Sequence, residues 1–135
     1  MNQQHDELTS NQTKWDSFLG NNHSGYVMKQ SRYCFCPPEY WGPFLVVVNS
    51  TDDVISATYL EESEYPGMPV DLDLVWLDSV QDAFNEVEQA LIKNAHEVEV
   101  TYDPVGGFPA AVYIDWEEMM IDEETSFSIG MVIPF

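Results

Sequence analysis

The sequence predicts an α+β fold in which two helices pack on one face of an antiparallel sheet. Residues 78–94 carry apolar side chains at helical spacing, whereas six other segments have the alternating or Val-rich patterns of strands. The segments follow one another in the order αβββ-αβββ. Strands joined by short turns pair antiparallel, and the apolar face of such a sheet needs helices to cover it.

The first half of the chain is expected to hold one short helix and three strands. Asn11 is a candidate N-cap for a helix at residues 11–19, and Gly20 ends it. Pro37 and Pro38 end the first strand, and Pro43 opens the second. The three strands are predicted at residues 26–36, 44–48 and 54–60.

The second half repeats this pattern after an acidic loop at residues 61–73. In the helix at 78–94, Ser79 and Asp82 match a capping box. Its apolar face is formed by Val80, Phe84, Val87 and Leu91. The last three strands are predicted at residues 97–102, 108–115 and 125–133.

Composition and charge set the domain count and exclude several classes of protein. The chain has 135 residues, with 24 acidic residues against 4 Lys and Arg, and its net charge is -20. That length suits one domain, and the 44% apolar content argues against disorder. Phosphate recognition needs a basic face, so we expect no nucleic-acid partner. No run approaches the roughly 20 apolar residues of a membrane helix, so we expect no transmembrane segment.

The domain organisation predicted from these patterns is a polar leader at 1–11 and a single domain at 12–135. The given chain contains no signal peptide. Gly42-Pro43-Phe44 and Gly107-Phe108-Pro109 stand at corresponding places in the two halves. We therefore interpret residues 12–62 and 76–134 as half-repeats of an internal duplication.

The two cysteines, Cys34 and Cys36, are candidates for a disulfide. On a strand, residues two apart share a face, with Cα atoms roughly 6.5–7 Å apart, at the upper limit for a disulfide. Two reduced thiols are the main alternative. A metal or redox site is the third interpretation, although a structural zinc ion is usually bound by four ligands.

The chain resembles a family of small exported bacterial proteins, many of them lipoproteins: the domain-of-unknown-function family six-one-seven-four. The resemblance covers about residues 12–133 and rests on Cys34-Phe35-Cys36-Pro37, Tyr102-Asp103-Pro104, Gly107-Phe108-Pro109, Ile114-Asp115 and Asp122-Glu123-Glu124. It implies a periplasmic, extracellular or cell-envelope location, which fits a disulfide. It implies no activity, substrate or catalytic residue. The given chain lacks a lipobox Cys, so the resemblance does not extend to a lipid anchor.

Acidic residues near the last strands are candidate metal ligands, because calcium prefers oxygen ligands. The candidates are Asp103, Asp115, Asp122, Glu123 and Glu124. Their spacing fits no EF-hand, and the alternative is a solvated turn whose charges protect strand ends.

Tyr40, Trp41 and Phe44 form a candidate interaction surface, because exposed aromatic residues often mark protein contacts. The alternative is that they pack over the sheet edge. The negative charge has three interpretations: a solvated surface, attraction of a basic protein, or mimicry of nucleic acid.

We therefore predict a non-enzymatic, exported acidic domain that acts as a protein-interaction module without a cofactor. The sequence contains no nucleophile string such as G-x-S-x-G, and we assign no catalytic residue. A calcium-stabilised structural domain and a nucleic-acid-mimic inhibitor of a basic protein are the alternatives, and an enzyme is the least favoured class.

Overall fold

A computed structural model describes residues 2–34, 36–117 and 124–135 of the chain. The described residues form two α-helices and six strands in the predicted order, which confirms the α+β class. None of the described helices is long and apolar enough to cross a membrane. The helices are α1 (Asn2–Leu19), η1 (Pro38–Tyr40, a 3-10 helix) and α2 (Val80–Ile92). The strands are β1 (Gly25–Tyr33), β2 (Phe44–Asn49), β3 (Val54–Tyr59), β4 (Glu97–Tyr102), β5 (Pro109–Asp115) and β6 (Glu124–Pro134).

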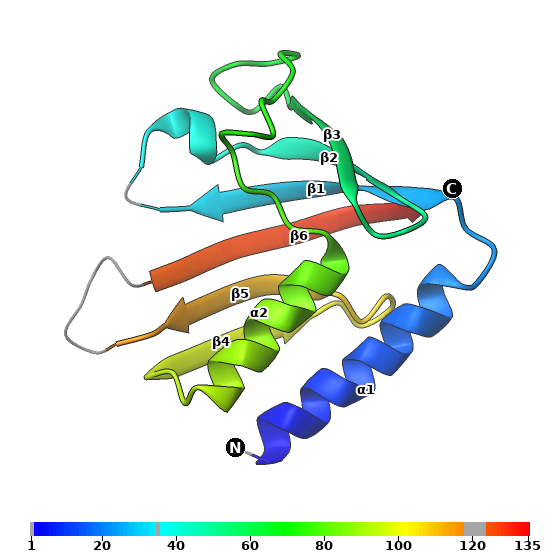
Figure 1. Cartoon of the computed structure of the whole chain (residues 1–135), viewed down its shortest axis with the longest axis vertical. Helices are drawn as coiled ribbons and strands as arrows, with labels where there is room; N and C mark the ends of the chain where they lie inside the picture. The colour runs from blue at the N-terminus through cyan, green and yellow to red at the C-terminus, as the bar shows by residue number, and fades with distance from the viewer. Residues whose placement is uncertain (1, 35, 118–123) are drawn as a thin grey trace.

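One antiparallel sheet holds all six strands in the order β3-β2-β1-β6-β5-β4 (Figure 1). Each half of the chain forms a meander, and β1 pairs with β6 to join them. Strands β1 and β6 therefore occupy the middle of the sheet. Side chains that β1 presents to the helices lie at the centre of the molecule, flanked by strands on both sides.

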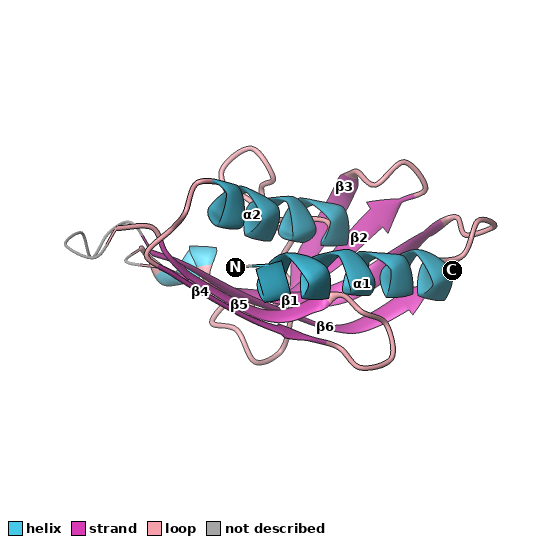
Figure 2. Ribbon diagram, turned by 90° about the horizontal axis from the view of Figure 1, so that it is seen from below, coloured by secondary structure: helices cyan, strands magenta, loops and turns pink. Residues whose placement is uncertain are grey.

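Both helices lie on the same side of the sheet (Figure 2). The core lies between the two layers, and strand alternation selects its members: Met28, Phe44, Val46, Val48, Val112, Ile114, Phe127 and Ile129 are buried. From α2, the predicted apolar face is buried, with Val80, Phe84, Val87 and Leu91 at most 3% exposed. Exposed Leu45 and Ile55 lie on the opposite face of the sheet.

The strand directions give the predicted duplication no support. Strand β1 runs antiparallel to β6, and β6 runs antiparallel to β5, which in turn runs antiparallel to β4. Strand β4 therefore runs opposite to β1, although the meanders progress across the sheet in the same sense. A rotation that superposes them must turn the sheet over and exchange its faces, whereas both helices lie on one face. The duplication stays a prediction from the sequence.

Helix α1 begins at Asn2, nine residues before the predicted start. The residues interpreted as a polar leader belong to the folded unit, because Leu8 is 1% exposed and Trp15, two turns later on the same face, is 3% exposed. Gly107 has a positive φ of 76°, and a Cβ at this position would lie 2.5 Å from the carbonyl oxygen of Asn11. This close approach packs α1 against the β4–β5 turn.

Candidate functional site

Two polar side chains on the inner face of β1 hold the segment that enters α2. The Gln30 amide donates to the Asp78 carbonyl oxygen at 2.8 Å, and the Asp78 backbone N–H donates to Gln30 Oε1 at 3.1 Å. Both residues are fully buried. Four residues earlier on β1, the Tyr26 hydroxyl accepts from the backbone N–H of Val80 at 2.9 Å. The strand thus fixes the start of α2 at two points and pairs an amide that a helix start leaves open.

Beside this start lies a group that we call the Tyr26–Asp52 cluster, consisting of Tyr26, Asp52, Ser79 and Asp82. Tyr26 Oη donates to Asp52 Oδ1 at 3.2 Å, and Ser79 Oγ donates to Asp52 Oδ2 at 2.6 Å. Ser79 and Asp82 exchange two bonds of 3.0 Å, which confirms the predicted capping box. Burial raises the pKa of the Asp52 carboxyl above its ordinary value, yet both of its oxygens have partners. The cluster ties the β2–β3 turn to α2.

A second group, the Arg32–Asp78 cluster, consists of Gln30, Arg32, Trp76, Asp78 and Glu86. The Arg32 guanidinium lies 3.4 Å from Asp78 Oδ2 and 3.8 Å from Glu86 Oε1. It also donates to Gln30 Oε1 at 3.1 Å. The indole N–H of Trp76 donates to Asp78 Oδ1 at 2.7 Å. One cation therefore faces two carboxyl groups.

The pairing of these two carboxyl groups is incomplete. Neither Asp78 Oδ2 nor Glu86 Oε2 accepts a hydrogen bond from the described residues. Burial, followed by the charge of Asp78 and a hydrogen bond to it, raises the pKa of Glu86 to about 8, against the opposing effect of Arg32. Two carboxyl groups form a hydrogen bond only when one of them carries a proton. A pKa raised in this way favours the protonated form of Glu86 near neutral pH.

The Arg32–Asp78 cluster opens on a pocket of about 280 Å³, which we call the two-tryptophan pocket. Trp76 and Trp116 line it together with Asp78 and Glu86. From α2, the lining also includes Asp82, Asn85 and Gln89. Among the described residues of this lining, three are acidic and none is basic. The pocket therefore combines aromatic surface with negative charge, a composition that suits a cationic group.

The two indoles that line this pocket are both fixed by hydrogen bonds. Trp76 is 71% exposed, although its N–H is bound to the buried Asp78. The N–H of Trp116 donates to Thr125 Oγ1 at 3.1 Å. An exposed indole costs the folded chain the burial of a large apolar surface. The exposure of Trp76 beside the pocket makes this region a candidate contact site.

A second pocket, of about 260 Å³, also includes Trp76. Its lining adds Arg32 and Tyr40 as well as Cys34 and Cys36, so we call it the disulfide pocket. Trp76 lines both pockets, and Arg32, which lines the disulfide pocket, pairs with Asp78 in the two-tryptophan pocket. Tyr40, one of the predicted interaction residues, falls within this region.

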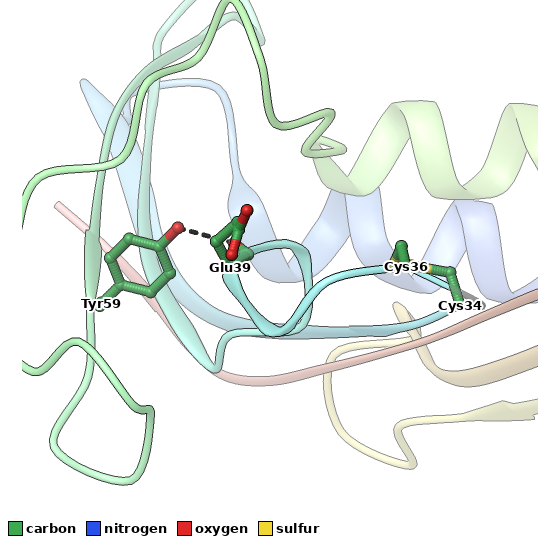
Figure 3. The surroundings of a disulfide bond; sticks show 4 residues. All are labelled: Cys34, Cys36, Glu39 and Tyr59. Atoms are coloured by element: carbon green, nitrogen blue, oxygen red, sulfur yellow. Dashed lines mark hydrogen bonds between the residues drawn. A yellow bond between two sulfur atoms is a disulfide. The ribbon is translucent and has the colours of Figure 1, made fainter.

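Cys34 and Cys36 are joined by a disulfide in the loop after β1 (Figure 3). Strand β1 ends at Tyr33, three residues before the predicted end, and the Cα atoms lie 5.2 Å apart, closer than two residues of a strand. The loop then enters η1, where the Glu39 carbonyl oxygen accepts from the Tyr59 hydroxyl at 2.6 Å. This bond anchors the segment that carries the disulfide to β3.

The predicted interaction residues separate in the structure. Tyr40 is half-buried, and Trp41 is 42% exposed. Phe44 is fully buried and contacts Tyr59, with ring centroids 5.2 Å apart, so its assignment to an exposed surface is wrong. The reason is the alternation along β2, which turns Phe44 toward the helices together with Val46.

The predicted metal ligands do not form one group. Asp103 lies in the β4–β5 turn, where its Oδ2 accepts from the N–H of Gly106 at 2.7 Å. Asp115 pairs with Glu97 and Glu124 at the other end of β5, about 20 Å away at strand spacing. Asp122 and Glu123 lie outside the described residues. Within the described ranges, no three His, Cys, Asp or Glu side chains are arranged to hold a metal. Calcium binding itself stays a prediction.

Sequence reasoning missed the five residues that carry the candidate site: Arg32, Trp76, Asp78, Glu86 and Trp116. One signal was present, because Gln30 and Arg32 continue the inward alternation of β1 with polar side chains. A polar residue on an apolar face needs a buried partner. The identity of that partner, Asp78, depends on a contact across 48 residues.

Comparison with known proteins yields one family and no individual relative. The model of a family described as a family of unknown function (DUF6174) matches residues 7–134. No curated protein and no solved structure matches the chain.

Proposed function

The chain belongs to the family of unknown function (DUF6174), and from this premise we propose that it is a non-enzymatic, exported binding domain for a basic protein. The surface around Trp76, with the two-tryptophan pocket and the disulfide pocket, is its contact site. It works without a metal or cofactor.

The exposure of Trp76 is the observation that carries this proposal. Exposed Trp side chains held in one orientation are frequent anchors of protein interfaces, because they bury a large area at little cost in entropy. Trp76 is 71% exposed and hydrogen-bonded to Asp78. Pockets to either side of such an anchor can receive side chains from a partner.

Charge complementarity supports the proposal of a basic partner. The net charge of -20 attracts a basic protein and speeds its association. Three acidic side chains, Asp78, Asp82 and Glu86, line the two-tryptophan pocket. Lysine-rich segments therefore fit both the overall field and the local site.

Export is supported by the resemblance to exported proteins and by the Cys34–Cys36 disulfide. Disulfides persist in oxidising compartments and are rare in the cytosol. We therefore place the protein in the periplasm, outside the cell or at the cell envelope.

A binding titration tests the proposal with a peptide of alternating lysine and serine as the probe. We expect Trp76→Ala to weaken binding by about tenfold or more, as interface anchors do. Trp41→Ala is the matched control, because Trp41 is also exposed and lies outside the lining of both pockets. Fluorescence anisotropy of a labelled peptide gives both affinities. Equal losses in the two variants, or no binding by the native protein at low salt, would overturn the proposal.

A further inference from the structure

The two-tryptophan pocket has a charge that the protein does not balance by itself. Arg32 is the cation of the Arg32–Asp78 cluster, and it faces both Asp78 and Glu86. It is also committed to Phe127, whose ring centroid lies 4.7 Å from the guanidinium carbon. Asp78 Oδ2 and Glu86 Oε2 accept no hydrogen bond from the described part of the chain. Asp78 is fully buried and lines the pocket, and besides the Arg32 guanidinium at 3.4 Å its Oδ2 faces the Glu86 carboxyl group.

The aromatic side chains of the pocket favour a cation. The N–H groups of Trp76 and Trp116 are used by Asp78 and Thr125. The ring surfaces of the two indoles therefore remain for a ligand, and the negative face of an indole attracts a cation. An anion would meet Asp82 as well as the two carboxyl groups of the cluster.

The size of the pocket favours one side chain of a partner. Its volume of about 280 Å³ lies at or below the small end of the range for small-molecule sites. A lysine side chain has a slim alkyl stem and an ammonium with three donors. Those donors match the oxygens of Asp78 and Glu86 that accept no hydrogen bond from a described donor, and the stem can pack on the indoles.

We propose that the two-tryptophan pocket binds the ammonium group of a lysine side chain in exchange for a proton of the Asp78–Glu86 pair. This inference rests on the proposed function, which supplies the lysine from a basic protein partner. The ammonium takes the place of the proton between the two carboxyl groups, and the proton passes to solvent.

The proton exchange follows from the groups that face Glu86. Asp78 and Asp82 oppose its ionisation, and Arg32 favours it, with burial as the largest influence, so that the pKa of Glu86 lies at about 8. A bound ammonium adds a second cation and favours the ionised form. Because a lysine ammonium keeps its charge up to about pH 10, binding should strengthen as the pH rises through 8.

Titration with N-acetyl-lysine methylamide tests this exchange directly. Calorimetry in two buffers of different ionisation enthalpy counts the protons released, and amide NMR shifts give the affinity and the location. We expect close to one proton released per ligand at neutral pH. The affinity should rise by about tenfold or more between pH 6 and pH 8.5, as linkage requires. N-acetyl-norleucine methylamide, which has a similar side chain without the charge, should bind at least tenfold more weakly.

Two variants on the same helix turn this into a matched comparison. Glu86→Gln removes the exchangeable proton, so the proton release and the pH dependence should disappear. Glu88→Gln removes a charge from α2 that does not line the pocket, and it should behave like the native protein. Proton release that persists in Glu86→Gln, equal binding of the norleucine derivative, or shifts that map away from Trp76 and Trp116 would overturn the inference.

The failure of this inference can be told apart from the failure of the proposed function. Binding of the lysine–serine peptide that depends on Trp76 but releases no proton would overturn the exchange and keep the binding domain. Proton-coupled binding of the lysine derivative without any binding of the peptide would support the pocket chemistry and overturn the basic protein partner.

Discussion

The Tyr26–Asp52 cluster and the Arg32–Asp78 cluster lie at the start of the same helix, and they differ in how completely their polar atoms are paired. Both oxygens of Asp52 accept hydrogen bonds, from Tyr26 and Ser79. In the other cluster, one oxygen of Asp78 and one of Glu86 accept none from the described residues, and both side chains line a pocket. A satisfied network holds the fold, whereas an incompletely satisfied one beside a pocket offers its atoms to a ligand.

The direction of a pKa shift does not separate the two clusters. Burial raises the pKa of both Asp52 and Glu86. Perturbed pKa values therefore indicate a functional site only together with geometry. Here the distinguishing geometry is that Glu86 lines the pocket beside the exposed Trp76, whereas Asp52 does not line it.

The largest expected effect comes from removing the cation of the Arg32–Asp78 cluster. Arg32→Met leaves the carboxyl groups of Asp78 and Glu86 together without a counter-charge, and we expect a loss of about 3–5 kcal/mol in unfolding free energy. Lys29→Met is the matched control on the same strand. Its ammonium pairs with Glu62 at 2.7 Å, but both side chains are more than a third exposed and screened by solvent, so the expected loss is much smaller than for Arg32→Met. Urea unfolding at neutral pH measures both variants, and equal losses would show that Arg32 has no special role.

A smaller effect is expected from the Tyr26–Asp52 cluster. Tyr26→Phe leaves the buried N–H of Val80 unpaired and removes one donor from Asp52, which should cost about 2 kcal/mol. Tyr33→Phe is the control, because Tyr33 is 58% exposed and surface changes cost at most about 0.5 kcal/mol. Urea unfolding compares the two. Tyr26 does not line the two-tryptophan pocket, so binding of the lysine derivative should stay unchanged in Tyr26→Phe. A loss of binding by the folded variant would remove the distinction between the clusters.

The fold was largely predictable because its elements have local signals. Alternation fixed the strands, and β4 (Glu97–Tyr102) matches the predicted range at both ends. The capping box of Ser79 marked the start of α2. The first nine residues of α1 were missed because Leu8 is one apolar residue in a polar segment, and the core that buries it comes from strands distant in sequence.

The candidate site was less predictable because it consists of contacts between distant segments. Gln30 forms a hydrogen bond with Asp78, 48 residues away, and the sequence around neither residue contains a motif that predicts the other. The aromatic residues near Pro37 predicted a surface at Tyr40 and Phe44, whereas the exposed indole belongs to Trp76, three residues after the acidic loop. Tyr40 nevertheless lines the disulfide pocket, so the predicted region was adjacent to the site.

The Glu86 carboxyl group faces both Asp78 and Arg32, and the pH dependence of stability tests its protonation most directly. Burial raises the folded pKa of Glu86 to about 8, above its ordinary value of 4.5. The stability that its neutral form contributes is therefore fully present below about pH 4.5 and is lost as the pH rises through 8. Glu86→Gln keeps a neutral side chain at every pH, so it should match the native protein near pH 5 and exceed it above pH 8.

Urea titrations of the native protein and Glu86→Gln between about pH 5 and pH 9 measure this difference. We expect the advantage of the variant to grow to about 2 kcal/mol, less than the full linkage because the Glu86 side chain is 28% exposed. Glu88→Gln should show no such growth. A difference between the native protein and Glu86→Gln that stays constant over this range would show that Glu86 does not take up a proton on folding.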